Sequence, residues 1–200
     1  MLSLIVALLI ILNPVSTVPA YVSMYPHTKT KQLIRDAATV AFWVLVILGI
    51  SAIAWQWLLD LFWLQIEYFR IAGGLVIAWV AWNMSQGHMS EITITEEHLQ
   101  HHKKRKLDRG LIIPLVMPMT AGPWSIAFVI SQAGDGNLTQ LLIAIGIASV
   151  VVYITVRYGT LLIDKLGDSG IKLMTRIIGI LLLGIALQII IGTVLTLVNQ

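Results

Sequence analysis

The stretch of sequence that decides the fold is residues 2–23, LSLIVALLIILNPVSTVPAYVS, which carries no charged side chain. A transmembrane helix uses about 20 predominantly apolar residues, so this run is long enough to cross a bilayer. Two prolines, Pro14 and Pro19, stand near its centre with polar residues between them. The run therefore predicts a membrane span that is interrupted near its middle.

The composition of the whole chain agrees with a membrane protein. Of its 200 residues, 58% are hydrophobic and 12% are charged, and the mean hydropathy is +0.86. A soluble domain is about a quarter charged, and a disordered chain needs low hydrophobicity, so both classes are excluded. The sequence contains no cysteine, which excludes disulfides, thiolate nucleophiles and cysteine-bound metals.

Five further apolar stretches follow the first one, and none alternates between apolar and polar residues as a transmembrane β-strand would. The basic residues lie between them in alternate connections. The first, third and fifth connections, with the adjoining span ends, hold 12 of the 13 Lys and Arg residues, and the exception is Arg70. Basic loops stay in the cytoplasm, so both termini are expected outside it. The expected spans are 2–23, 37–59, 68–86, 110–132, 139–163 and 174–198.

The two halves of the chain resemble each other. The pattern P-x-x-x-x-P begins at Pro14 in the first span and at Pro118 in the fourth, and R-I-x-G begins at Arg70 in the third span and at Arg176 in the sixth. Because each half holds three spans, the second half must enter the membrane from the opposite side. This arrangement is an inverted-topology repeat, which recurs in secondary transporters.

The fold class predicted from these patterns is an all-α polytopic membrane protein with six transmembrane helices, of which helices 1 and 4 are broken. The first three-helix repeat is expected at 1–86 and the second, inverted repeat at 110–200. A polar cytoplasmic linker at 87–109 would join them.

The paired prolines predict that the first and fourth helices stop and resume near mid-membrane. An interior proline costs a helix ~3 kcal/mol, and the carbonyl groups that it frees need partners in lipid. We expect non-helical backbone near 13–18 and 118–122. Thr17 and Thr120 would be N-caps, with Pro19 and Pro123 in the first turn of the resumed helices. The simpler interpretation is two kinks that only shape packing.

Two such breaks, facing each other, would form a binding site without charged side chains. Exposed N–H groups at a helix N-terminus attract a carboxylate, and exposed carbonyl and hydroxyl oxygens attract an ammonium group. The site would therefore suit a small zwitterion. The candidate substrate-binding residues are Asn13, Pro14, Ser16, Thr17, Thr120, Ala121, Gly122, Trp124 and Ser125.

Carboxylates are expected only in connections or at span ends, Asp36 among them. Since intramembrane carboxylates commonly form proton relays, the coupling ion stays open between Na⁺, H⁺ and uncoupled exchange. An enzyme is not expected, because no nucleophile–base pair, carboxylate dyad or set of metal ligands lies inside a span. Gln188, deep in the sixth span, is the polar residue of most interest, although such residues more often join helices than bind ligands.

The linker contains the basic run HHKKRK at 101–106. We interpret it as a topology anchor, and Lys103–Lys106 would also suit anionic lipid head groups. His98, His101 and His102 have helical spacing, but no fixed fourth ligand is evident, so no metal or other cofactor is predicted. No nucleic-acid partner is expected, because the basic residues are loop charges of a membrane protein.

Three segments resemble the signature sequences of the MarC family, and the resemblance extends over essentially the whole chain. They are Asn13-Pro14 with Pro19, residues 69–74 (FRIAGG) and residues 114–123 (PLVMPMTAGP). The resemblance implies a multi-pass protein of the prokaryotic cytoplasmic membrane. The transporting members of the family, called SnatA, take glycine and alanine, which implies a secondary transporter of small neutral amino acids.

The chain departs from the family pattern at two positions of the candidate site. Ser16 stands where the family usually has glycine, and Trp124 stands where it usually has a small residue. A tryptophan would either roof a small pocket or point into lipid, so these positions bear on the substrate more than on the fold. The alternative functions are a channel or exporter of another small solute, and a membrane scaffold or regulator without transport.

Overall fold

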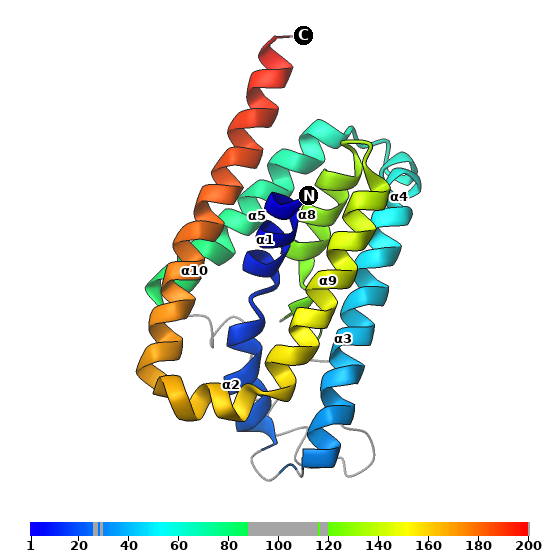
Figure 1. The fold of residues 1–200 in the computed structure, drawn as a ribbon. Coiled ribbons are helices and arrows are strands. Elements are labelled where there is room, and N and C mark those ends of the chain that lie inside the picture. Colours follow the sequence, from blue (N-terminus) through cyan, green and yellow to red (C-terminus); the bar gives the residue numbers. More distant parts are fainter. Residues whose placement is uncertain (26–27, 29, 88–115, 117–119, 200) are drawn as a thin grey trace.

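The chain forms a bundle of helices in this computed structural model, which describes residues 1–25, 28, 30–87, 116 and 120–199 (Figure 1). Those residues are almost entirely α-helical and include no strand, which confirms the predicted all-α class. Among them, four stretches are long and apolar enough to cross a membrane: Leu2–Val22, Thr30–Ile53, Leu138–Arg157 and Ser169–Val198. A bent helix pair within 55–86 makes a fifth candidate.

The first span consists of two helices in line, α1 (Leu2–Leu12) and α2 (Pro14–Met24). Each has 11 residues, so the interruption falls at the centre of the span. Leu8, Ile11 and Leu12 of α1 are almost completely enclosed next to the interruption, and α2 stays largely buried as far as Tyr21. The core of the bundle therefore surrounds the break.

The second span is α3 (Thr30–Ile53), which begins earlier than predicted. The short helix α4 (Trp55–Leu61) and the third span α5 (Ile66–Gln86) follow, with a bend of 102° between them. The connection exposes large aromatic side chains, and Trp63 is 95% exposed. Such rings favour the membrane–water interface, so we expect the bend to lie at that boundary.

The described second half contains α8 (Pro123–Ala133), α9 (Leu138–Arg157) and α10 (Gly159–Val198). The helix α10 turns sharply at Gly167, where φ is +63°, and its first part crosses the lower end of the bundle (Figure 1). The beginning of the predicted fourth span lies outside the described residues, apart from Val116 and Thr120. The linker histidines and the basic run Lys103–Lys106 lie outside them as well.

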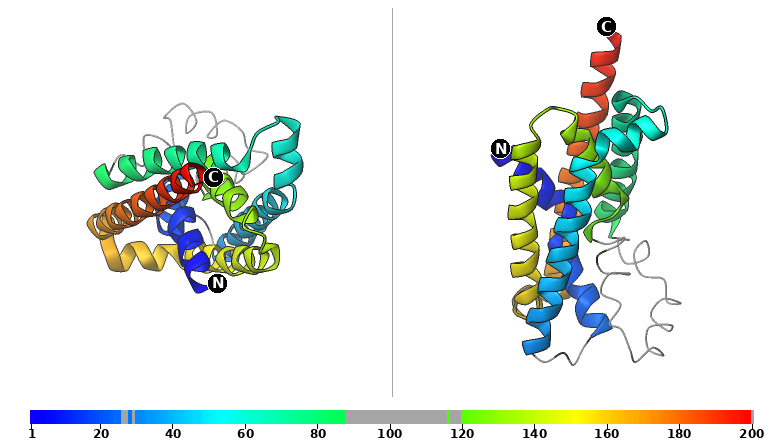
Figure 2. Two further views of the ribbon diagram at one scale, coloured as in Figure 1. Left: turned by 90° about the horizontal axis from the view of Figure 1, so that it is seen from above. Right: turned by 90° about the vertical axis from the view of Figure 1, so that its right-hand side faces the viewer.

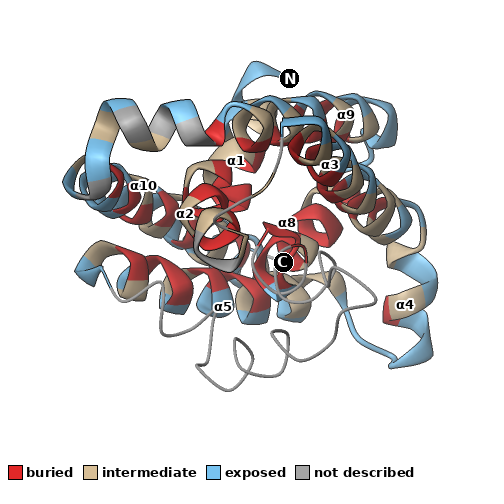
Figure 3. Ribbon diagram, turned by 90° about the horizontal axis from the view of Figure 1, so that it is seen from below, coloured by how far each residue is buried: buried red, intermediate tan, exposed pale blue. Residues whose placement is uncertain are grey.

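The long helices pack in pairs from the two halves of the chain. α5 packs along α10, and α3 packs along α9. The shorter helices α2 and α8 occupy the centre, where the buried residues gather (Figure 3). Both termini lie toward the same end of the molecule (Figure 2).

Two glycines permit the close approach of α5 and α10. A Cβ atom on Gly74 would lie 2.6 Å from Cγ1 of Ile190, and one on Gly179 would lie 2.7 Å from the backbone nitrogen of Ser85. Small residues at interfaces are a general means of bringing membrane helices together. Gly179 is the glycine of the second R-I-x-G segment, whereas Gly74 follows the glycine of the first, Gly73, whose Cβ position lies 2.9 Å from the Cβ atom of Ala127 on α8.

Candidate functional site

The first helix break is a single residue, Asn13. Its backbone is left-handed, with φ 41° and ψ 60°, and its N–H donates to the Leu9 carbonyl at 3.1 Å. Pro14 then begins α2, where a residue without an N–H and with a fixed φ is well suited. The predicted interruption over 13–18 was therefore too long, because residues 14–18 are helical. Thr17 is not an N-cap, and Pro19 lies inside α2.

The second break includes Ala121 and Gly122. The Ala121 N–H donates to the Val116 carbonyl at 2.8 Å, five residues back, which is a widened helical turn. Gly122 is extended and α8 begins at Pro123, which therefore lies in the first turn of the resumed helix, as predicted. The N-cap is Gly122 rather than Thr120. Residues 117–119, the remainder of the predicted break, lie outside the described part of the chain.

The two resumed helices begin with the same local structure. In α2, proline is first and Ser16 is third; in α8, proline is first and Ser125 is third. The Ser16 hydroxyl donates to the Asn13 carbonyl at 3.0 Å, and the Ser125 hydroxyl donates to the Gly122 carbonyl at 2.9 Å. The structural equivalent of Pro14 is therefore Pro123, whereas the P-x-x-x-x-P pattern aligns Pro14 with Pro118.

The two breaks meet in the interior of the bundle. The hydroxyl oxygens of Thr17 and Thr120 lie 3.1 Å apart, and both side chains are fully buried. All the other candidate substrate-binding residues are buried too, and they form two adjacent groups: Asn13, Pro14 and Ser16 at the first break, and Ala121, Gly122, Trp124 and Ser125 at the second.

The side chain of Asn13 is the outstanding feature of this junction. It is 1% exposed, yet its Oδ1 and Nδ2 atoms have no hydrogen-bond partner among the residues that the structure describes. A buried polar group without a partner costs about 1–3 kcal/mol, and a left-handed backbone at a non-glycine residue adds to that cost. The amide therefore offers one acceptor and two donors at the point where both helices are interrupted.

Trp124 points into the protein interior rather than into lipid. It is the second residue of α8, 6% exposed, and belongs to the main hydrophobic core. Of the two orientations considered from the sequence, the lipid-facing one is thus wrong. The indole occupies volume beside the second break.

The sequence did not reveal that a carboxylate is buried among the helices. Asp36 was expected in a connection, but it lies in the second turn of α3 and is 1% exposed. Tyr21 donates a hydrogen bond to its Oδ2 at 2.7 Å, and Gln32 donates one to its Oδ1 at 2.9 Å. The helix was predicted to begin too late, because Lys31 and Arg35 beside it resemble a polar connection. This cluster ties α2 to α3.

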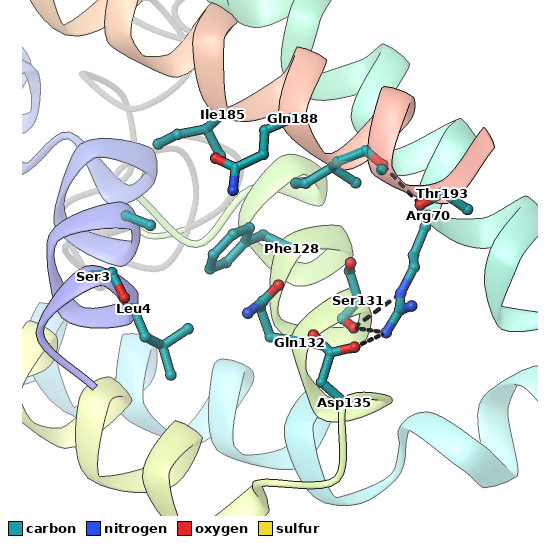
Figure 4. Close-up of a pocket in the computed structure, with 13 residues that line it drawn as sticks. Ser3, Leu4, Arg70, Phe128, Ser131, Gln132, Asp135, Ile185, Gln188 and Thr193 are labelled. Carbon is teal, nitrogen blue, oxygen red and sulfur yellow. Dashed lines mark hydrogen bonds and ion pairs between the residues drawn. The ribbon is translucent and has the colours of Figure 1, made fainter. Parts of the chain in front are cut away.

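A cavity of about 290 Å³ opens among α1, α5, α8 and α10 (Figure 4). Gln188 lines it, together with Gln132, Phe128, Arg70 and Asp135. Arg70 donates through Nη2 to the Ser131 carbonyl at 2.9 Å and forms an ion pair with Asp135. Gln188, the intramembrane polar residue of most interest in the sequence, thus faces a cavity.

Comparison with known proteins identifies relatives over nearly the full length of the chain. Residues 1–198 match the family described as "MarC family integral membrane protein". A UPF0056 membrane protein of Pyrococcus abyssi is 33% identical over 94% of this chain and 90% of its own. One of Aquifex aeolicus is 31% identical over 92% and 87% of the two chains.

A more distant relative is the UPF0056 membrane protein YhcE of Escherichia coli, which is 27% identical over 93% of this chain and 87% of its own. No solved structure matches the chain. The family match covers almost every residue, including both helix breaks and the cavity. The chain therefore belongs to the MarC family of integral membrane proteins.

Proposed function

We propose that the protein is a secondary transporter of small neutral amino acids, which it binds between the two helix breaks. The observation that carries this proposal is the buried amide of Asn13, which is unpartnered within the described part of the chain. Since buried polar groups normally have a hydrogen-bond partner, this amide supports a site at which a polar solute supplies one.

The helix ends supply the electrostatics for a zwitterion. α2 and α8 both begin at the junction, so two partially positive N-termini converge where Thr17 and Thr120 meet. A substrate carboxylate would lie there and accept from backbone N–H groups and from the Asn13 Nδ2 atom. The ammonium group would face hydroxyl oxygens, the Asn13 Oδ1 atom and the carbonyl groups at the end of α1.

We propose that the protein has six membrane spans arranged as an inverted repeat. Such an architecture would allow transport by alternating access. The packing supports the inverted repeat, because exchanging the two halves leaves the contacts of α5 with α10 and of α3 with α9 in place and converts the other major contacts into one another. The contact between α2 and α10 corresponds to that between α8 and α5, and the contact of α1 and α2 with α9 corresponds to that of α8 with α3. One half would rock against the other around the junction.

The proposed location is the prokaryotic cytoplasmic membrane, with both termini outside the cytoplasm. The charge distribution of the connections supports this orientation. Relatives in both bacteria and archaea support a cell membrane.

The decisive experiment replaces Asn13 by glycine. Glycine keeps the left-handed backbone at no steric cost but removes the amide, so Asn13→Gly should fold at least as stably as the wild type. Uptake of labelled glycine and alanine into proteoliposomes should fall by about ten-fold or more, since a hydrogen bond to a charged group is worth about 1.5–3 kcal/mol. Thermal unfolding in detergent measures the stability.

The matched control is Asn83→Gly. Asn83 is also a membrane-span asparagine, but its Nδ2 atom donates to the Trp79 carbonyl of its own helix at 2.7 Å. That variant should keep its uptake and lose stability. Full uptake by Asn13→Gly would overturn the site. Wild-type liposomes that move other solutes but no amino acid would favour a channel or exporter, and liposomes that move nothing would favour a scaffold.

A further inference from the structure

The cavity in Figure 4 is a separate place from the junction of the two breaks. It is lined by the first two turns of α1, the start of α5, the last turns of α8 and the second part of α10. Two lining residues give its distance from the breaks. Ala7 in α1 precedes the first break, Asn13, by six residues, and Phe128 in α8 follows the second break, Gly122, by six residues. At 1.5 Å per helical residue, both lie ~9 Å from their break and on the same side of it.

Two glutamines from different helices point into this cavity (Figure 4). They are Gln132 on α8 and Gln188 on α10, and neither side-chain amide makes a hydrogen bond within the described part of the chain. Gln188 is exposed and Gln132 is half-buried, and an amide exposed within a membrane span is costly unless it meets water or a polar solute. The two amides therefore indicate a cavity that contains water or a polar solute.

The lining provides partners for both ends of a zwitterion. Each glutamine offers a carbonyl oxygen to an ammonium group and N–H donors to a carboxylate. Arg70 and Asp135 add one charge of each sign at the wall. The volume of about 290 Å³ suits a small solute together with a few water molecules, because a water molecule takes about 30 Å³.

Phe128 separates the cavity from the junction. It is 3% exposed, lines the cavity, and lies one helical turn from Trp124 at the second break. A solute in the cavity would have to pass this ring to reach Asn13. The two sites can therefore be occupied independently.

Given the transport function proposed above, we infer that the cavity is a second, entry site for small zwitterionic amino acids, held by Gln132 and Gln188 and closed off from the junction by Phe128. The solute binds here first, on the face of the protein that carries both termini. It reaches the helix breaks in a later step.

The absence of cysteine from the chain makes occupancy measurable. Ser3→Cys places the only thiol in the cavity wall, and Ser169→Cys places one on an exposed residue that does not line the cavity. The purified variants react in detergent with a methanethiosulfonate reagent, with and without glycine or alanine. At ten times Kd, the amino acid should slow the reaction at Ser3→Cys about ten-fold, because only the free fraction reacts. Ser169→Cys should be unaffected.

Further substitutions in the Ser3→Cys protein show whether the amino acid that protects the thiol is bound in the cavity or at the junction. Replacing both Gln132 and Gln188 by leucine should abolish it, whereas Gln140→Leu, an exposed glutamine outside the cavity, should leave it unchanged. Asn13→Gly should lose uptake but keep the protection. Acetate and methylammonium, which each carry one charge of the zwitterion, should protect less than alanine.

Two results would overturn the entry site. One is an unprotected Ser3→Cys protein that still transports alanine. The other is protection that disappears in Asn13→Gly and persists in the double leucine variant. In that case the amino acid that protects the thiol would be bound at the junction and not in the cavity. Protection without any uptake would retain the cavity site and reject the transport function, so the two proposals fail separately.

Discussion

Ser16 and Ser125 make the same hydrogen bond at the starts of two helices from opposite halves of the chain. Each hydroxyl returns to the carbonyl of the residue three positions earlier, at 3.0 Å and 2.9 Å respectively. In each case that earlier residue forms the break and a proline follows it. The chain thus builds both interruptions from the sequence X-Pro-x-Ser, where X is asparagine in one and glycine in the other.

The contact between Thr17 and Thr120 should couple the two breaks energetically. Replacing either residue by valine keeps the shape and removes a hydroxyl. Each single variant should lose stability, and the double variant should lose less than the sum, with a coupling of about 0.6 kcal/mol typical of membrane helices. Unfolding in detergent of the four proteins of this cycle measures the coupling. Strict additivity would mean that the hydroxyls do not bond.

Gly179→Ala should destabilise the bundle. The new methyl group would meet backbone and Cβ atoms of α5 at 2.7–3.0 Å, and overpacking of this kind costs about 1–3 kcal/mol. Gly184→Ala is the matched control, because nothing lies within 4 Å of its Cβ position in the same helix. That variant should unfold at or above the wild-type temperature. Equal behaviour of the two variants would contradict the close packing of α5 on α10.

Trp124 should limit the size of the substrate. If its indole roofs the junction, Trp124→Ala should admit serine and valine beside glycine and alanine. One methylene in such a pocket is worth about 1–3 kcal/mol, so the competition constants should shift by about ten-fold or more. Removing a buried tryptophan also costs ~3–5 kcal/mol of stability, so Trp124→Phe is measured beside it and should shift selectivity in the same direction. Unchanged selectivity in both variants would remove Trp124 from the site.

Both termini should face away from the cytoplasm. A reporter enzyme that is active only outside the cytoplasm, fused after Gln200, should be active. The same reporter inserted in the linker at 87–109 should be silent, because that connection holds the densest basic run. The opposite pair of results would reverse the orientation.

Much of this fold follows from local sequence. Helix length, apolar runs and the positions of the prolines predicted the all-α class and both interruptions, because proline and glycine act within one turn. The sequence could not give the length of the first break. Asparagine tolerates a left-handed backbone, so the helix is interrupted at Asn13 alone rather than over the whole interval between the prolines.

The candidate site residues divide in the same way. Asn13, Thr17 and Thr120 could be proposed from the sequence because they lie within three residues of the paired prolines. Asp36 could not, since its burial depends on Tyr21 from another helix. Gln188 attracted notice as a polar residue in an apolar span, but its partner across the cavity, Gln132, comes from a different half-helix and has no signal in the sequence.

The equal lengths of α1 and α2 have an electrical consequence. At 11 residues each, they are ~16 Å long, about half the thickness of a hydrocarbon core. An ion bound at Asn13 would sit about halfway across the membrane voltage, so its binding would change by about 1 kcal/mol per 100 mV. A zwitterion carries no net charge and would respond little. Voltage dependence of substrate affinity would therefore reveal whether an ion accompanies the amino acid to the centre of the membrane.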